Sequence, residues 1–191
     1  MNRIKLLATA IAICIAAISC SQKQNDPVAV CENGQFEGYT EDNGVFAFKG
    51  VPYAKAPLGE HRWKAPQPVE ASDGVFEAKT NGLPSLQSYD EGEMASHGEL
   101  SEDCLYLNVW TKDLKMHKGR PVMVWFHGGS YGWGGTIDPL YEGKYLVAEY
   151  PDVVLVSVEY RVNALGFIDF IDVPGGEAFP DAPYLGILDQ Q

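Results

Sequence analysis

Basic side chains are scarce in this sequence relative to acidic ones. The chain has 14 lysine and arginine residues against 26 aspartate and glutamate residues, a formal net charge of −12 over 191 residues. A surface of this sign repels phosphate backbones and anionic membrane faces. The composition therefore disfavours nucleic-acid binding.

Side chains suited to hold a metal are also few. The sequence contains four cysteines and four histidines, and no C-x-x-C pair. The histidines show no spacing typical of metal ligands; they are His61, His97, His117 and His127. We therefore expect no metal site, and no cofactor is implied.

No apolar run is long enough to span a bilayer comfortably. The N-terminal run covers 13 residues, Leu6 to Ile18, and follows the basic residues Arg3 and Lys5, as in a secretory signal peptide. A buried or membrane-spanning helix is the alternative, but the polar residues 21–26 that follow carry no stop-transfer signal.

The end of this run, Ala17-Ile18-Ser19-Cys20, resembles a bacterial lipobox, in which a small residue precedes a lipidated cysteine. We expect lipid on Cys20 to hold an exported domain at a membrane of the bacterial cell envelope, on the periplasmic or outer-membrane face. The expected organisation is a signal peptide with a lipobox-like end at 1–20, a linker at 21–27 and a domain at 28–191.

The 20 glycines and 12 prolines indicate a strand-rich or mixed α/β chain rather than a helical bundle. Asn33-Gly34 and Asn43-Gly44 each separate short apolar runs, which predicts a small antiparallel meander at the start of the domain. Residues 49–70 are predicted to form a loop without regular structure, because prolines and a glycine recur there; they are Pro52, Pro57, Gly59, Pro66 and Pro68.

Buried strands are predicted further along the chain. Leu105–Trp110 and the apolar runs 121–126 and 153–158 have strand composition, and the last two resemble strands covered on both faces. Residues 140–150 suit a short helix between them. This β–loop–α–β order predicts an α/β fold with a mixed, mostly parallel sheet.

Four segments in a fixed order together resemble one family. They are Phe48–Ala54 with its continuation to Trp63, Ser101–Val109, His127–Ser130 and Glu159–Phe167. The order is similar to the N-terminal part of a type-B carboxylesterase, the α/β-hydrolase family of cholinesterases and bacterial p-nitrobenzyl esterases. The resemblance covers roughly residues 30–191 and implies hydrolysis of small carboxylic esters.

The Gly-rich segment after the strand at 121–126 suits ester chemistry. Ester hydrolysis forms an oxyanion, which backbone N–H groups stabilise when they converge from an uncrowded loop. The resemblance implies that Gly129 and Ser130 are these donors, with Ser130 standing where the family usually has a third glycine. A plain Gly-rich turn is the alternative.

Ser130 also completes a G-x-S-x-G pattern, Gly128 to Gly132, which suggests a nucleophile elbow. An elbow leads into a helix, however, and the glycines that follow form helices poorly. We therefore do not expect Ser130 to be the nucleophile. The resemblance gives the neighbouring His127 a supporting role in the loop.

The family's nucleophile, acid and catalytic histidine come after the segment matched by residues 185–191. The 191 residues are therefore expected to hold an oxyanion loop without a triad, as the N-terminal fragment of an exported ester hydrolase that is inactive alone. A non-catalytic binding or adhesion protein on the same scaffold is the alternative.

The resemblance also implies structural contacts. It pairs Arg62 with Glu102 and Arg161 with Asp189, because arginine can bind a carboxylate through two N–H groups; solvated surface charges are the alternative. Ser85 stands in place of the cysteine that usually bridges to Cys104, so we expect a free thiol there. A bridge from Cys104 to Cys31 is the alternative.

The C-terminal edge is expected to be the unstable part. Residues 185–191 begin a helix of at most two turns, and the buried strand at 153–158 needs neighbours on both sides. We therefore expect an exposed apolar face and an unpaired sheet edge, which favour aggregation or capture by a complementing chain.

Overall fold

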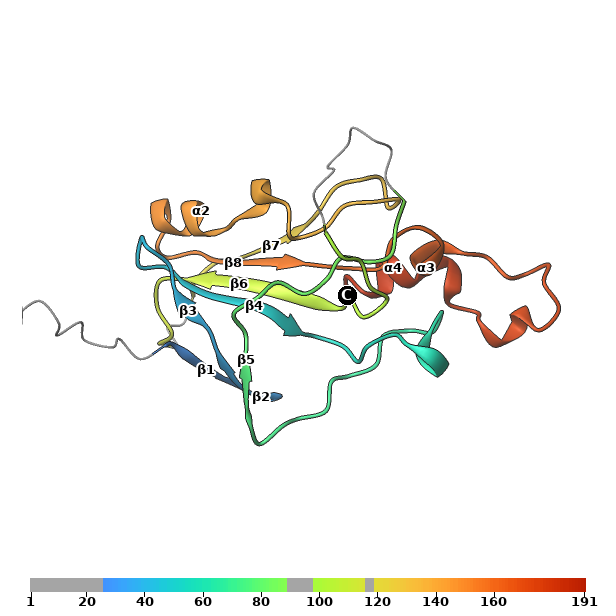
Figure 1. Cartoon of the computed structure of the whole chain (residues 1–191), viewed down its shortest axis with the longest axis horizontal. Coiled ribbons are helices and arrows are strands. Elements are labelled where there is room, and N and C mark those ends of the chain that lie inside the picture. Colours follow the sequence, from blue (N-terminus) through green and yellow to red (C-terminus); the bar gives the residue numbers. More distant parts are fainter. Residues whose placement is uncertain (1–25, 89–97, 116–118) are drawn as a thin grey trace, which may run out of the picture.

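The structure is a computed structural model of the chain and describes residues 26–88, 98–115 and 119–191. Two sheets form the described part, with strand orders β1-β2-β5 and β3-β4-β6-β8-β7 (Figure 1). The strands are β1 Val28–Cys31, β2 Gly34–Glu37, β3 Tyr39–Thr40, β4 Phe46–Pro52, β5 Val75–Glu77, β6 Tyr106–Thr111, β7 Val122–Phe126 and β8 Val154–Val158. The helices are α2 Lys144–Glu149, α3 Asn163–Phe167 and α4 Leu185–Leu188, with 3₁₀ turns at Gly59–His61, Pro139–Tyr141, Gly176–Ala178 and Ala182–Tyr184.

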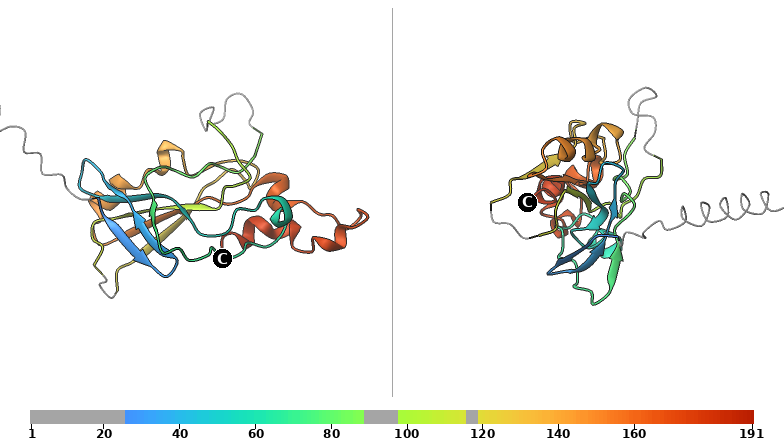
Figure 2. Two further views of the ribbon diagram at one scale, coloured as in Figure 1. Left: turned by 60° about the horizontal axis from the view of Figure 1, so that its bottom comes forward. Right: turned by 90° about the vertical axis from the view of Figure 1, so that its left-hand side faces the viewer.

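The larger sheet lies between α2 and the smaller sheet, and α3 and α4 gather at one end of it (Figures 1 and 2). On the α2 side, Val147 packs with Trp110 and Leu155 in one apolar cluster. On the other side, Phe36 of β2 packs with Phe48 of β4. Burial of these side chains supplies the main driving force that holds the layers together.

The expected meander is two hairpins in two different sheets. β1 pairs with β2 in the smaller sheet, whereas β3 pairs with β4 in the larger one. Gly38 separates β2 from β3, and an added Cβ there would lie 2.2 Å from the carbonyl oxygen of Ala47. Glycine therefore lets the chain pass between the sheets at close contact, a long-range feature that the hairpin signals do not reveal.

The expectation of a structureless segment at 49–70 is wrong at its start. β4 continues to Pro52, and its pairing with β6 shifts between Phe48 and Val51. Gly50 takes a φ of +67° at this bulge and donates its N–H to the side chain of Asn108 at 2.9 Å. Pro52 is tolerated because it is the last residue of the strand, where it need not donate to the ladder. The 3₁₀ turn Gly59–His61 is a second departure.

β7 and β8 form the expected strand–loop–helix–strand unit, and they pair in parallel. The sheet is mixed, as expected, but its other pairings within the described residues are antiparallel. β8 is largely buried. β7 is an edge strand whose Val122, Met123, Val124 and Trp125 are 45–60% exposed, so the expectation that both of its faces are covered is wrong here.

Three local features complete the comparison with the sequence. The expected helix at 140–150 is shorter, a 3₁₀ turn followed by α2 after Gly143. Gly143 cannot hold a larger side chain, because its Cβ would lie 2.5 Å from the Trp110 ring. β5, which pairs in parallel with β2, was not expected. The C-terminal segment forms α4, a single short helix, as expected.

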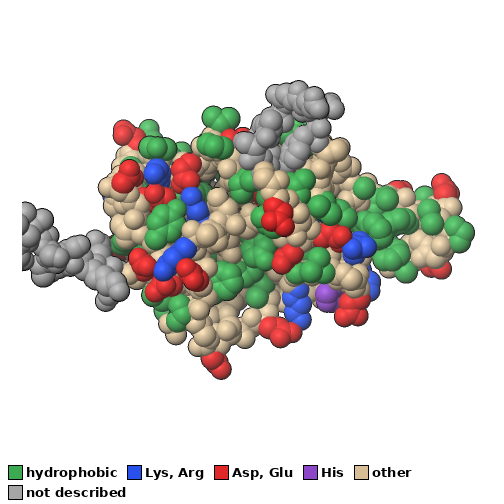
Figure 3. Space-filling view, viewed as in Figure 1, with side chains coloured by type: hydrophobic (Ala, Val, Ile, Leu, Met, Phe, Trp, Pro, Cys, Tyr) green, Lys and Arg blue, Asp and Glu red, His purple; other side chains and the backbone are tan. Residues whose placement is uncertain are grey.

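Acidic and basic side chains are scattered over the surface shown in Figure 3. Five basic side chains that are not fully buried form ion pairs with carboxylates: Lys49, Lys55, Lys79, Lys144 and Arg62. Within residues 26–88, 98–115 and 119–191, no helix has the length and apolar character needed to cross a membrane. Cys20 and the segment 1–25 lie outside the described residues.

Candidate active-site loop

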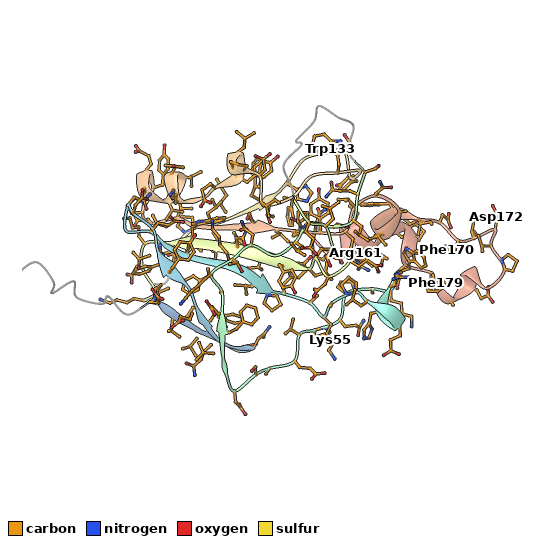
Figure 4. All side chains as sticks on the ribbon, in the orientation of Figure 1. Lys55, Trp133, Arg161, Phe170, Asp172 and Phe179 are labelled. Atoms are coloured by element: carbon orange, nitrogen blue, oxygen red, sulfur yellow. The ribbon has the colours of Figure 1, made fainter. Side chains whose placement is uncertain are left out.

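The Gly-rich loop follows β7 and makes a tight turn that only glycine permits at two positions. Gly129 has a φ of +115°, and a Cβ there would lie 1.8 Å from the carbonyl oxygen of Trp133. Gly134 has a φ of +118°, and its Cβ would lie 2.4 Å from the Gly128 oxygen. The carbonyl of Gly129 accepts the N–H groups of Gly132 and Trp133. These two hydrogen bonds close the loop on itself, between Gly129 and Trp133, which Figure 4 labels.

Ser130 and Tyr131 both occupy the left-handed region, with φ of +53° and +60°. For residues with a side chain this conformation costs on the order of 1–3 kcal/mol each, so surrounding contacts must hold it. Asn163 donates its N–H to the Tyr131 carbonyl at 2.7 Å, and the Tyr131 ring packs on Phe167 at 4.9 Å between centroids. The start of α3 thus fixes the turn in place of the usual glycine.

Among the described residues, no hydrogen-bond acceptor takes the N–H of Gly129 or of Ser130. Ser130 is exposed and Gly129 is half-buried. Two adjacent backbone donors therefore stand at an accessible turn, without a protein partner in the described part of the chain.

Ser130 does not sit in a nucleophile elbow. The residues after it form turns and bends up to the 3₁₀ turn Pro139–Tyr141, and no α-helix begins at the serine. His127, the neighbouring histidine, points its Nδ1 at the Gly128 carbonyl oxygen, 2.9 Å away. The geometry agrees with the expectation that this G-x-S-x-G match is accidental.

His127 connects the start of the loop to the residues that follow β8. Its ring stacks on that of Tyr160, with centroids 4.3 Å apart, and its carbonyl accepts the Tyr160 hydroxyl at 2.7 Å. Its Nε2 lies 3.4 Å from Oε1 of Glu159, and both side chains are buried. The other carboxylate oxygen of Glu159 accepts the N–H of Thr136 at 2.7 Å. Burial also raises the pKa of the Tyr160 hydroxyl above its usual value, so this hydroxyl stays neutral.

Gln87 holds the far side of the loop. Its side-chain oxygen accepts the N–H of Gly134 at 2.5 Å, and its side-chain nitrogen donates to the Gly134 carbonyl at 2.7 Å. These two bonds satisfy both polar groups of a buried glycine.

Both arginine–carboxylate contacts that the resemblance implied are present. Arg161 binds Asp189 through Nε at 2.8 Å and Nη2 at 2.7 Å, and both side chains are buried (Figure 4 marks Arg161). Arg62 binds Glu102 through Nε at 2.5 Å and Nη2 at 2.7 Å, with side chains 42% and 18% exposed. The first pair ties α4 to the end of β8, and the second joins the loop after β4 to the segment before β6.

Cys104 is a free thiol, as expected, and so is the exposed Cys31. Cys104 is buried, and desolvation raises its pKa well above the usual value. Ser85, in place of the family's cysteine, is buried near it and accepts the Val162 N–H. Within the part of the chain that the structure describes, no group of three or more His, Cys, Asp or Glu side chains could hold a metal ion.

The comparisons with known proteins agree with this architecture. A family model described as the carboxylesterase family matches residues 25–190. The chain is 41% identical over 166 residues to a para-nitrobenzyl esterase of Bacillus subtilis (strain 168), covering 85% of this chain and 32% of that protein. It is 38% identical over 183 residues to a cholinesterase of Mus musculus, covering 90% and 29%.

Solved structures give the same result. A crystal structure of a carboxylesterase of Geobacillus stearothermophilus superimposes with a TM-score of 0.75 and 42% identity, covering 85% of this chain and 32% of that one. A thermophilic pNB esterase gives 0.73 and 36%, covering 86% and 33%. This chain belongs to the carboxylesterase family and has part of its α/β-hydrolase fold. It spans about a third of the length of the curated relatives it matches.

The sequence pattern located the loop but missed most of its support. Glu159, Tyr160 and Gln87 contact residues 23 to 47 positions away. Glu159 and Tyr160 begin one of the four segments that carry the resemblance, but that motif does not indicate that they contact the loop. One signal was available for Glu159, because a carboxylate that directly follows a buried apolar strand needs a partner.

Proposed function

We propose that this chain supplies the oxyanion-stabilising loop of an exported carboxylic-ester hydrolase, with the N–H groups of Gly129 and Ser130 as the donors. The observation that carries this proposal is that no acceptor among the described residues uses either N–H group. Donors fixed before the reaction stabilise the developing charge without a reorganisation cost. The Gly129–Trp133 turn and the contacts of Tyr131 provide this fixation.

Small carboxylic esters are the proposed substrates, in line with membership of the carboxylesterase family. In the complete enzyme, a serine nucleophile, a histidine base and an acidic residue supply the remaining chemistry, and the chain described here positions the carbonyl oxygen. No cofactor takes part in this mechanism.

The 191 residues are proposed to be inactive by themselves. The structure describes two histidines, His61 and His127, and among the described residues neither bonds to a serine hydroxyl. Ser130 lies in a turn, and no described histidine bonds to it. An oxyanion loop alone has no activated nucleophile. Export and a lipid anchor on Cys20 complete the proposal and rest on the signal-like segment 1–20.

The first experiment measures hydrolysis of p-nitrophenyl acetate by residues 21–191, with Ser130→Ala as the control. No serine-dependent turnover above background is expected. Turnover that Ser130→Ala abolishes would show that the G-x-S-x-G match is a real nucleophile site.

The second experiment tests the oxyanion donors in a chimera, in which residues 28–191 replace the matching part of the Bacillus subtilis esterase. Gly129→Ala forces the turn to move, because its Cβ meets the Trp133 oxygen. Loss of one donor typically lowers kcat by about 10²–10³. Gly128→Ala is the matched control, since its Cβ meets nothing within 4 Å. Equal activities of the two variants, or a chimera that folds but has no activity, would contradict the proposal.

A further inference from the structure

The end of β8 holds both ends of the Gly-rich loop. Glu159 accepts the N–H of Thr136, at the end of the loop, through Oε2. Its Oε1 faces Nε2 of His127, at the start of the loop, and Tyr160 stacks on the same ring. Two consecutive residues therefore connect the loop to the sheet at both of its ends.

The hydrogen bonds of His127 determine where its protons can lie. Nδ1 is 2.9 Å from the Gly128 carbonyl oxygen, which only accepts, so Nδ1 carries a proton. A neutral ring would then have a bare lone pair on Nε2, opposite Oε1 of Glu159. These two atoms have no other hydrogen-bond partner among the described residues. Two buried acceptors facing each other would each lose a bond that water would have made.

One proton between Nε2 of His127 and Oε1 of Glu159 gives each of these two atoms a hydrogen bond. It converts two opposed lone pairs into an imidazolium–carboxylate contact, which is the strong form of such a hydrogen bond. The other carboxylate oxygen, Oε2, already accepts the N–H of Thr136, so a proton on this contact leaves both oxygens of Glu159 with a hydrogen bond.

Among the described residues near Glu159, no other charged group can play this part. Arg161 is already bound through two nitrogens to Asp189. Tyr53 and Cys104 are also close enough to Glu159 to interact with its charge. Burial raises the pKa of each of these two groups, so both stay neutral. Of the described groups around this carboxylate, His127 alone can compensate it.

We infer that His127 is an imidazolium paired with the Glu159 carboxylate at neutral pH, and that Glu159 is a positioning residue of the oxyanion loop. The pair itself does not depend on the esterase proposal; only the catalytic meaning of the loop rests on it. Glu159 touches no reacting atom and acts through His127 and Thr136.

Replacing Glu159 by glutamine removes the negative charge but keeps the side chain's hydrogen bonds to the loop. It therefore tests the charge separately from the positioning of the loop. The glutamine side-chain oxygen can accept the Thr136 N–H, and its side-chain N–H can donate to a neutral Nε2 of His127. Glu159→Gln therefore keeps every hydrogen bond and removes the need for the extra proton. Glu159→Ala removes both bonds and leaves the Thr136 N–H and His127 unpartnered.

The test is ring-nitrogen NMR of the full chain labelled with ¹⁵N-histidine at pH 7.5, where an ordinary exposed histidine is mainly neutral. His127→Gln assigns the resonance, and His61, which is partly exposed, is the internal reference. The expected result is an imidazolium signal for His127 in the native chain. In Glu159→Gln the same ring is expected to be neutral, with the proton on Nδ1 only.

Three results would overturn the inference. They are a neutral His127 in the native chain, an imidazolium that persists in Glu159→Gln, and a Glu159→Gln chain that melts as low as Glu159→Ala. In the chimera, Glu159→Gln is expected to retain kcat within a few-fold, while Glu159→Ala lowers kcat more than it changes KM. The NMR result stands whether or not the chimera hydrolyses esters, so failure of the pair and failure of the proposed function remain distinguishable.

Discussion

Asp189→Asn should destabilise this domain far more than a change of the same kind at Glu102. Asp189 accepts three hydrogen bonds from Arg161, two from the guanidinium and one from the backbone N–H at 3.1 Å. Asparagine keeps the size of the side chain but removes its charge and part of its accepting capacity. The Arg161 side chain is 2% exposed, so its guanidinium would then be a buried, uncompensated cation.

The size of the effect follows from burial. Removing one partner of a buried ion pair costs about 3–5 kcal/mol, because the other charge stays desolvated. Arg62 and Glu102 have the same two-nitrogen geometry, but their side chains are 42% and 18% exposed. Solvent screens a pair as exposed as this one, so it contributes little to stability. Glu102→Gln is therefore the matched control, because it breaks a contact of the same geometry that is not buried.

The assay is urea unfolding of residues 21–191 at low protein concentration, followed by near-ultraviolet circular dichroism. With a slope of about 1–3 kcal/mol per molar urea, Asp189→Asn should lower the midpoint by at least about 1 M. Glu102→Gln should change it much less. Because we expect the chain to be marginally stable, Asp189→Asn is expected to be largely unfolded without urea. Equal effects of the two variants would refute the argument that burial sets the strength of these contacts.

Three further predictions concern the thiols, the anchor and the sheet edge. In the folded domain at pH 8, Cys31 should react with a thiol reagent while Cys104 does not, because burial raises the pKa of Cys104 and blocks access to it. After denaturation without reductant, both thiols should react. A count of one thiol or none would indicate a bridge. Labelled palmitate should enter the chain in a bacterial host and should be lost in Cys20→Ala, whereas equal labelling of both would exclude this cysteine as the anchor. Residues 21–191 should be poorly soluble alone, because β7 leaves an apolar edge exposed, and both Val124→Lys and coexpression with the complementary part of a relative should increase the soluble yield. A monodisperse wild-type monomer with a cooperative melt would show that the edge needs no cover.

The sequence predicted those elements whose structure is specified by neighbouring residues. The apolar runs at 105–110, 121–126 and 153–158 are strands, and the hairpins form at the two Asn-Gly dipeptides. The sequence did not reveal which sheet each hairpin joins or that β5 exists. These features depend on pairing between distant segments, and Gly38 is explained only by its close approach to Ala47.

The same limit applies to the candidate site. Resemblance to the family located Gly129 and Ser130, because the pattern there is a contiguous motif. It did not indicate how a serine could take a glycine's conformation, which depends on Asn163 and on ring packing by Tyr131. The exposure of β7 could not be inferred either, because an apolar run predicts that a strand needs cover and not whether the described residues provide it.

The contact of Gln87 with Gly134 has a consequence for how the loop can vary. The Gln87 side chain donates from Nε2 to the carbonyls of Gly134 and Ser85 and accepts the Gly134 N–H at Oε1. It therefore bonds both polar groups of Gly134, as the backbone of an adjacent strand would. Asparagine is one methylene shorter, and an ionised glutamate has no donor. Such a position will tolerate few replacements and can be mistaken for a catalytic residue. Because a side chain bonds the N–H and the carbonyl of Gly134, the loop keeps its shape without pairing with a strand. The register of the sheet therefore does not fix the length of the loop.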